Sequence, residues 1–388
     1  MSERSYFDWN ATAPLRPQAR LAFETALLLS GNPSSVHAEG RAARRAVEDA
    51  RQQVAALVGA RASDVFFTSS GTEANMLALS PAWETAAEKQ ACDRLLISAV
   101  EHVSVRSGGR FPRAAVEEVP VDVQGRVNLT ALAETLARSK RSLVSLMLAN
   151  NESGVIEPVA EAAALVHAAG GLLHVDAVQA AGRIPCDMAA LGADLLTLSA
   201  HKIGGLTGTG ALVRSSEDMH LADPLIRGGG QERGLRAGTE NVAGIAAFGA
   251  AAATARRERE AEAKRMLALR DRLEAGLRSI APQTVIFGLG AERLPNTTLF
   301  TLDGMKAETA VIAFDLEGIA VSSGAACSSG KVQPSHVLAA MGVSPALRRG
   351  AVRVSLGWET TETDVERLLS AWRKLATALS KGQRGVAA

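Results

Sequence analysis

The stretch from residue 171 to residue 202 constrains the fold of this chain more than any other. An apolar run over 171–175 ends on the acid Asp176, and a second apolar run over 195–198 ends on a polar group. Residues 188–191, between the two runs, have helical spacing. This pattern predicts a strand, a crossover and a second strand. Ligands bind at the carboxyl ends of such strands, so we expect one crevice to hold these residues: Asp176, Gln179, Ser199, His201 and Lys202.

The residues at these two strand ends suit pyridoxal 5'-phosphate (PLP). This cofactor needs a lysine amine to form a Schiff base, which Lys202 can supply. It also needs a carboxylate that keeps its pyridine nitrogen protonated, which Asp176 can supply. The alternative is structural, with His201 and Lys202 as a surface pair and Asp176 as a helix N-cap. Both features at adjacent strand ends favour the cofactor.

A candidate anion site lies earlier in the chain. The apolar run 65–68 is followed by SSGTEAN over 69–75 and by a helical stretch over 76–79. Free backbone N–H groups and the positive end of a helix dipole bind anions at such a turn, here the PLP phosphate. Thr72 supplies a hydroxyl, and Gly71 permits close backbone approach. The alternative is a plain capping box around Thr72.

Length and charge limit the classes of protein that this chain can belong to. A chain of 388 residues is too long for one core of typical size, so two domains are expected. The net charge is +1 with interspersed signs, which predicts no nucleic-acid partner. No apolar run is long enough for a membrane span, and the N-terminus has no apolar signal core, so we expect a cytoplasmic protein.

The fold class expected is α/β, with a large PLP-binding domain over 16–255 and a smaller α+β domain. The large domain has a mostly parallel sheet flanked by helices. The alanine-rich and then charged stretch 242–280 predicts one or two helices that link the domains. The small domain comprises 1–15 and 256–388, because short strand candidates follow the linking stretch, at 284–287, 297–302 and 352–355.

The chain has three cysteines and no C-x-x-C motif, which argues against a disulfide framework or a structural zinc site. We expect no metal site, and we interpret Cys92 and Cys186 as inert structural thiols. Cys327 lies among Ser, Ala and Gly, and the stretch 319–334 has neither helical nor strand periodicity. A mobile loop near 322–333 is therefore expected. A reactive thiol and a buried small side chain both remain open for Cys327.

Several separated motifs resemble the class V aminotransferase group of fold-type I PLP enzymes. They are HVDAVQ over 174–179, SAHK over 199–202 and the cysteine loop SSGAACSS over 322–329. Within that group the chain resembles the cysteine desulfurases of the NifS/IscS type, from Tyr6 to about Glu366. The departures are Trp9, Ser328 for a common threonine, and Leu206-Thr207 where many relatives have Pro-Lys.

The resemblance implies a role for each matching residue. His102, at the end of the strand 95–100, stacks on the PLP ring, and Gln179 tunes the ring. Asn151, after the strand 142–149, binds near the ring hydroxyl and the substrate carboxylate. Arg353 is the candidate for binding that carboxylate. Thr239, in the glycine- and arginine-rich loop 227–241, reaches the phosphate of the other subunit of a homodimer.

The resemblance also implies the activity, conversion of L-cysteine to L-alanine with a persulfide on Cys327. The sulfur then passes to an acceptor such as an iron–sulfur scaffold, for cluster or other cofactor biosynthesis. Cys327 would contact a cluster only in complex with that scaffold. Two alternatives stay open: selenocysteine lyase or another class V PLP enzyme, and an inactive sulfur-relay or assembly protein. The thiol of Cys327 discriminates against transamination, and the intact Lys202 and Asp176 argue against an inactive protein.

Overall fold

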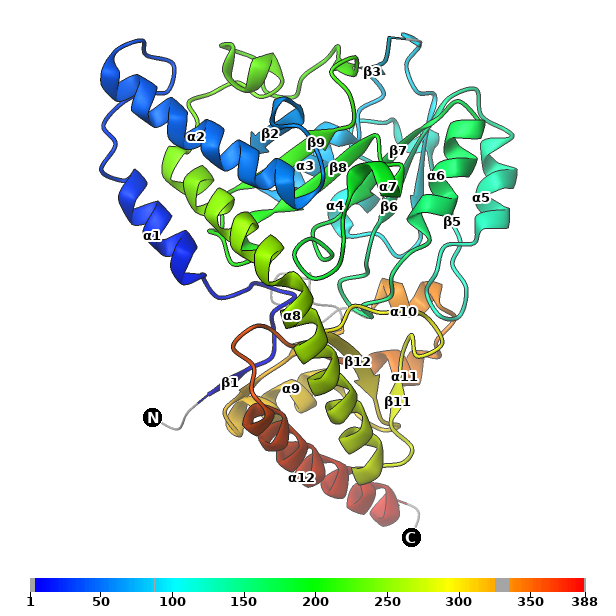
Figure 1. Ribbon diagram of the computed structural model, residues 1–388. Coiled ribbons are helices and arrows are strands. Elements are labelled where there is room, and N and C mark those ends of the chain that lie inside the picture. The colour runs from blue at the N-terminus through cyan, green and yellow to red at the C-terminus, as the bar shows by residue number, and fades with distance from the viewer. Residues whose placement is uncertain (1–3, 87, 325–334, 387–388) are drawn as a thin grey trace.

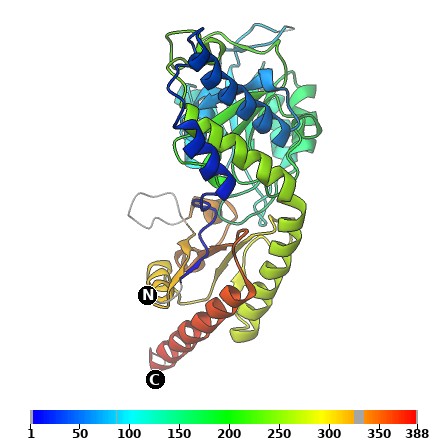
Figure 2. The same ribbon diagram turned by 60° about the vertical axis from the view of Figure 1, so that its left-hand side comes forward.

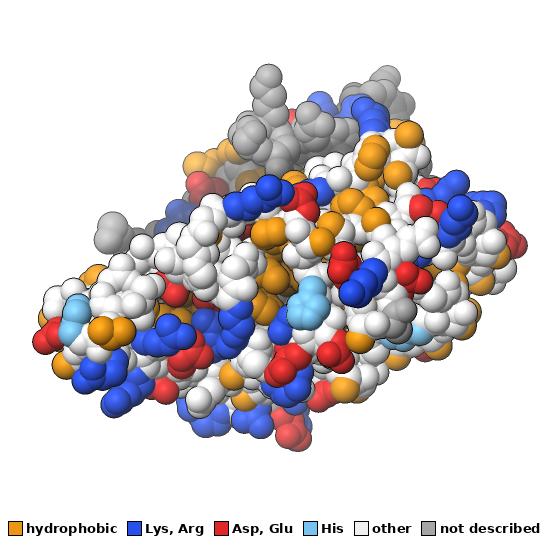
Figure 3. Space-filling view, turned by 90° about the horizontal axis from the view of Figure 1, so that it is seen from above, with side chains coloured by type: hydrophobic (Ala, Val, Ile, Leu, Met, Phe, Trp, Pro, Cys, Tyr) orange, Lys and Arg blue, Asp and Glu red, His pale blue; other side chains and the backbone are white. Residues whose placement is uncertain are grey.

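The structure is a computed structural model that describes residues 4–86, 88–324 and 335–386. The chain forms two lobes of unequal size, joined by one long helix (Figure 1; Figure 2). Acidic and basic side chains are mixed over the face of the larger lobe that Figure 3 shows. Within the described residues, no helix is both long and apolar enough to span a bilayer.

The larger lobe is built on a sheet whose strands are, in chain order, Val65–Thr68 (β2), Arg94–Ser98 (β4), Val116–Val119 (β5), Ser142–Met147 (β6), Leu172–Asp176 (β7), Leu195–Ser199 (β8) and Gly210–Arg214 (β9). Their order across the sheet is β2-β9-β8-β7-β6-β4-β5. Neighbours from β8 to β5 are parallel, whereas β9 runs antiparallel to both β2 and β8. The prediction of a mostly parallel sheet is confirmed.

Helices cover both faces of this sheet, which explains why its central strands are buried throughout and rich in Leu and Val. Along β7, Leu173 and Val175 pack into the core on one face and Leu172 into the core on the other. The first face is covered by Pro17–Ala26 (α1), Ala38–Leu57 (α2), Leu129–Leu136 (α5), Val159–Ala168 (α6), Met188–Leu191 (α7) and the first half of Val242–Ile280 (α8). The second face is covered by Gly71–Ala78 (α3) and Val103–Arg106 (α4).

The smaller lobe contains an antiparallel sheet of Val285–Ile286 (β11), Thr297–Thr301 (β12), Val352–Ser355 (β15) and Ser322–Ser323 (β14), in that order. Its helices are Ala307–Leu316 (α9), His336–Ala340 (α10), Pro345–Arg349 (α11) and Glu362–Val386 (α12). Near the N-terminus, Ser5–Tyr6 (β1) pairs in parallel with Ile319–Ala320 (β13). A further pair, Trp83–Glu84 (β3) with His220–Leu221 (β10), is antiparallel and lies in the larger lobe.

The expectation that 319–334 contains no strand is wrong at its beginning. Residues 319–320 form β13 and residues 322–323 form β14, which pairs with β15. Strands of two residues are too short to show an alternating pattern, so periodicity could not reveal them. The remainder of the predicted loop, 325–334, lies outside the described residues and includes Cys327.

Helix α8 is a single helix that enters both hydrophobic cores. Its residues Ile245 to Ala255 pack in the core of the larger lobe, and Met266 to Leu277 pack in the core of the smaller lobe. The helix continues unbroken through residues 255 and 256. The division of the chain into domains at that point stays a prediction.

Candidate active site

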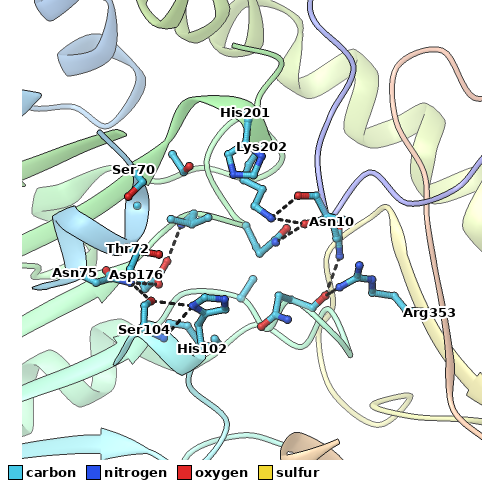
Figure 4. A pocket seen from close by; sticks show the side chains of 18 residues that line it. Asn10, Ser70, Thr72, Asn75, His102, Ser104, Asp176, His201, Lys202 and Arg353 are labelled. Atoms are coloured by element: carbon cyan, nitrogen blue, oxygen red, sulfur yellow. Dashed lines mark hydrogen bonds between the residues drawn. The ribbon is translucent and has the colours of Figure 1, made fainter. Parts of the chain in front are cut away.

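A cavity of about 290 Å³ lies at the carboxyl ends of β7 and β8 (Figure 4). The chain arranges around it most of the residues expected from the sequence: Gly71, Thr72, His102, Asn151, Asp176, Gln179, Ser199, His201, Lys202 and Arg353. Thr239 lies elsewhere, beside a cavity of about 100 Å³ that Ser69 also lines. Cys327 is outside the described residues.

Lys202 ends a short 3₁₀ turn, Ala200–Lys202, that follows β8 directly. Its Nζ donates hydrogen bonds to the backbone oxygens of Asn10, at 2.7 Å, and Ala11, at 2.8 Å (Figure 4). The N-terminal segment therefore crosses from the smaller lobe to hold the amine at the cavity. The resemblance to the desulfurases places the Asn-Ala-Thr stretch at 10–12 near the active site, but no specific role was predicted for Asn10, whose backbone oxygen makes this contact.

Asp176 is the last residue of β7, and its side chain is held by two hydrogen bonds. Its Oδ1 accepts the N–H of Val178 at 3.0 Å, and its Oδ2 accepts Nδ2 of Asn75 at 2.9 Å. The residue is only 5% exposed, so these contacts fix the carboxylate at the wall of the cavity. Asn75 was missed by the sequence analysis. Its position three residues after Thr72 places both side chains on one face of α3.

Two histidines line the cavity with pKa values below their ordinary range. Burial lowers the pKa of His102, the negative charge of Asp176 opposes that effect, and the positive charge of Lys202 lowers the pKa further. Burial and the charge of Lys202 lower the pKa of His201 to about 4. Both effects favour neutral imidazole rings at neutral pH.

Helix α3 begins at the cavity, directly after β2. Ser70 is its N-cap, and Ser70 Oγ accepts the N–H of Glu73 at 3.1 Å. A capping interaction is thus present, but Ser70 and Glu73 form it, so the alternative that Thr72 is the cap is wrong. A Cβ on Gly71 would lie 3.2 Å from side-chain carbons of Val178 and Ser199. Glycine therefore fits at position 71 without displacing these two side chains. The N–H groups of the first turn of α3 face the cavity.

Arg353, in β15, brings the smaller lobe to the cavity. Its guanidinium donates to the backbone oxygen of Asn151 at 2.9 Å and to Oδ1 of Asp8 at 2.7 Å. Its side chain is buried, and Nε has no hydrogen-bond partner among the described residues. Ser322 of β14 is paired with Arg353 in the sheet. The first residue of the predicted cysteine loop therefore lies beside this arginine.

Gln179 is fixed by residues on both sides. Its Nε2 donates to the backbone oxygen of Asn10 at 2.9 Å, and its Oε1 accepts Nη1 of Arg183 at 2.5 Å. Arg183 is buried, and burial together with the charge of Arg353 lowers its pKa to about 10. This role of Arg183 was not predictable, because an arginine seven residues after the end of a strand is an ordinary feature.

The two cysteines within the described residues, Cys92 and Cys186, are buried away from the cavity. Burial raises the pKa of the Cys92 thiol to about 11 and that of the Cys186 thiol to about 12. Both side chains pack in the hydrophobic cores of the larger lobe. Thiols in such surroundings are inert, because the reactive form is the thiolate.

The described residues around the cavity fit PLP. A lysine amine, a buried carboxylate and the N-terminus of α3 are the groups that hold the aldehyde carbon, the pyridine nitrogen and the phosphate of this cofactor. Gly71 and Thr72, in the first turn of α3, line the same cavity as the lysine and the carboxylate. Fold and site together define an α/β enzyme of the PLP-dependent class.

Comparisons with known proteins agree with this class and narrow it. The family model described as "Aminotransferase class-V" matches residues 5–368. A protein named cysteine desulfurase from Cereibacter sphaeroides is 43% identical over 95% of this chain and 94% of its own length. The protein named cysteine desulfurase NifS from Azotobacter vinelandii is 39% identical over 94% of this chain and 90% of its own length.

Solved structures show the same relationship. The X-ray structure of a NifS-like protein from Rickettsia africae superposes with a TM-score of 0.86 at 36% identity, and the match covers 97% of this chain and all of that one. The chain therefore belongs to the aminotransferase class-V family, a family of PLP-dependent enzymes, and within it to the cysteine desulfurases of the NifS/IscS type.

Proposed function

We propose that this protein is a PLP-dependent cysteine desulfurase that converts L-cysteine to L-alanine and passes the sulfur to an acceptor protein. The observation that carries the proposal is the arrangement of Lys202, Asp176 and Arg353 around one cavity. Lys202 and Asp176 suit the cofactor, and Arg353 suits the carboxylate of an amino acid. The relatives named cysteine desulfurase support the choice of substrate.

PLP, when bound, withdraws electrons from the bonds of the substrate's α-carbon. Asp176 would supply the carboxylate for its pyridine nitrogen, and the first turn of α3, with Gly71 and Thr72, would bind its phosphate. His102, Asn151, Gln179, Ser199 and His201 would hold the ring and orient the cofactor toward Lys202.

The substrate's own atoms are handled by three side chains. The guanidinium of Arg353 binds the α-carboxylate of L-cysteine. The amine of Lys202 removes the proton from the α-carbon. The Cys327 thiolate attacks the substrate sulfur, so that a sulfur–sulfur bond forms as the substrate's carbon–sulfur bond breaks. The carbon then takes up a proton, and the products are alanine and a persulfide on Cys327.

The proposal extends to partners and location. We expect a homodimer in which Thr239 of one subunit serves the phosphate of the other, and a cytoplasmic enzyme. The persulfide on Cys327 is delivered to a scaffold for iron–sulfur clusters or to another sulfur acceptor. The names of the relatives support sulfur transfer, as in the protein named IscS from Dictyoglomus turgidum, 38% identical over 98% of this chain.

The test follows both products. The PLP-loaded protein is incubated with L-cysteine and a reductant, and we expect equal amounts of sulfide and alanine. Cys327→Ala should abolish sulfide release, whereas the matched variant Cys92→Ala should not change it. Sulfide release that survives in Cys327→Ala would contradict the persulfide route and favour selenocysteine lyase or another PLP reaction. A wild type that binds PLP but turns over no L-cysteine would contradict the activity.

A further inference from the structure

A series of hydrogen bonds runs along the wall of the cavity from Asp176 to His102 (Figure 4). Asn75 Nδ2 lies 2.9 Å from Asp176 Oδ2 and also 2.9 Å from Ser104 Oγ. Ser104 Oγ lies 2.8 Å from His102 Nδ1, and the backbone nitrogen of Ser104 lies 3.2 Å from the same atom. Asn75 and Ser104 are buried, at 1% and 8% exposure, so solvent does not compete for these contacts.

The orientation of the Asn75 amide follows from its contact with Asp176. A carboxylate oxygen only accepts hydrogen bonds, and the other oxygen of Asp176 already accepts the N–H of Val178. The Asn75 atom that faces Asp176 must therefore be the amide nitrogen. That nitrogen has two hydrogens, and the second points to Ser104 Oγ. Asn75 Oδ1, turned away from both, is buried without a hydrogen-bond partner among the described residues.

The orientation of Asn75 determines where the proton of the Ser104 hydroxyl lies. Ser104 Oγ accepts from Asn75, so its single hydrogen is available to donate. The atom in reach is His102 Nδ1. This nitrogen faces two donors, the hydroxyl and the backbone N–H of Ser104, and can therefore only accept. In the neutral ring the hydrogen is then on Nε2.

We propose that Ser104 is a positioning residue that, together with Asn75, fixes His102 as the Nε2–H tautomer. His102 then offers a hydrogen-bond donor from Nε2, while Nδ1 stays engaged on α4. The tautomer does not depend on the proposed function, but its use in catalysis rests on that function. In this assignment Ser104 acts through His102.

The charge state of His102 depends on the same contacts. A hydrogen bond donated to Nδ1 stabilises the neutral ring and so opposes protonation. Among the described residues, the titratable groups around His102 are Asp176 on β7, Lys202 after β8, His336 on α10 and the preceding Glu101. Burial lowers the pKa of His336 and raises that of Glu101, and both shifts favour the uncharged form of these neighbours. Loss of the Ser104 hydroxyl should therefore make His102 easier to protonate.

The first test is the wild-type tautomer, measured by ¹⁵N NMR on PLP-loaded protein with labelled histidine. The chain has seven histidines, so the ring signals of His102 are identified by comparison with His102→Gln. We expect an unprotonated Nδ1 and a protonated Nε2 throughout the neutral pH range. A protonated Nδ1 in the wild type would overturn the proposal, whatever the variants do.

The second test compares three variants in the same experiment. Ser104→Ala leaves the backbone N–H as the remaining donor to Nδ1, so it should increase the fraction of the Nδ1–H tautomer and raise the pKa of His102 by about 0.5–1 unit, the size that one lost hydrogen bond supports. Ser104→Thr keeps the hydroxyl and should restore the wild-type signals. Ser107→Ala is the matched control, since Ser107 donates to a backbone oxygen of the same helix at 3.0 Å. Ser107→Ala should change neither the tautomer nor the pKa of His102.

Two outcomes of the variant series would overturn the proposal. One is a tautomer and pKa in Ser104→Ala that equal the wild-type values. The other is a change in Ser107→Ala as large as that in Ser104→Ala, which would indicate a general loosening of α4. Sulfide release is followed in parallel. A protein that holds the Nε2–H tautomer of His102 but releases no sulfide would contradict the proposed function and leave the proposed role of Ser104 intact.

Discussion

At the scale of single residues, the most specific prediction about substrate binding concerns Arg353. Its guanidinium is held by Asp8 and by the backbone of Asn151, and it belongs to the cavity wall. Arg353→Lys keeps the charge but loses the planar fork that matches a carboxylate. We expect the KM for L-cysteine to rise about tenfold, the effect of one lost charged hydrogen bond. PLP binding, followed by absorbance, should remain.

The control for Arg353→Lys is another buried arginine. Arg293 pairs with both carboxylate oxygens of Glu274, at 2.8 Å and 2.9 Å, and does not line the cavity. Arg293→Lys should lower the free energy of unfolding and leave the KM unchanged. An equal rise in KM for both variants would show that Arg353 acts through stability and does not bind the carboxylate.

Some residues of the candidate site could be predicted from the sequence, and others could not. Lys202 and Asp176 were predictable, because each follows an apolar run that forms a strand, and the two strands are neighbours in the sheet. Asn75 and Ser104 were not, since their meaning depends on contacts made across 101 residues in one case and 29 in the other. A polar residue on a helix has too many ordinary roles for its type alone to reveal such a contact.

At the scale of elements, the connection between β6 and α6 contains a buried acid that links stability to pH. Oε2 of Glu157 accepts the N–H of Val127 at 2.8 Å, and Oε1 has no hydrogen-bond partner among the described residues. Burial raises the pKa of Glu157 from 4.5 to about 8. Between these pH values the folded protein holds a proton that the unfolded chain has released, so stability falls as pH rises.

Glu157→Gln replaces the titratable carboxyl by an amide that does not titrate. The free energy of unfolding should then depend less on pH. One proton corresponds to about 1.4 kcal/mol per pH unit. We therefore expect the free energy of unfolding, measured with urea from pH 5 to pH 8, to fall less steeply in the variant. Glu161→Gln, at an exposed position on α6, is the control. Equal slopes in the wild type and in Glu157→Gln would contradict the assignment.

Elements with a clear apolar pattern were predictable, and those without one were not. The run 65–68 coincides with β2, and the stretch 188–191, for which helical spacing was noted, forms α7. Strand β5 was missed, since its two glutamates are typical of an edge strand and hide the pattern. The place of β9 between β2 and β8 was not predictable, because strand order depends on long-range pairing.

At the scale of the whole molecule, the cavity depends on both lobes. Lys202 and Asp176 come from the larger lobe, and Arg353 comes from the smaller one. Asn10 connects them, since its Nδ2 donates to the backbone oxygen of Asn151 at 3.2 Å and to Oγ1 of Thr297 at 3.0 Å. The residues proposed to bind the cofactor are thus linked to Arg353, the arginine proposed to bind the substrate, through contacts that no local pattern in the sequence could show.

The surface of the larger lobe supports the proposed homodimer. Large apolar side chains are exposed on α1 and in the connection to α2: Leu21, Leu27, Leu28 and Val36, each more than half exposed. A second copy of the chain that packed against them would remove this apolar surface from water. Thr239 adds a second argument, because it lies outside the cavity of its own chain and could serve the cavity of a second copy.

Mixed dimers test whether sites are shared. Lys202→Ala and Thr239→Asp should each inactivate their own homodimers, since one lacks the amine and the other repels the phosphate. A mixed dimer has one site with Lys202 from one chain and Thr239 from the other, so equal mixing and exchange should restore about a quarter of the wild-type sulfide release. If Thr239 serves its own chain, both sites stay defective and mixing restores nothing. Light scattering on the same samples shows whether dimers are present.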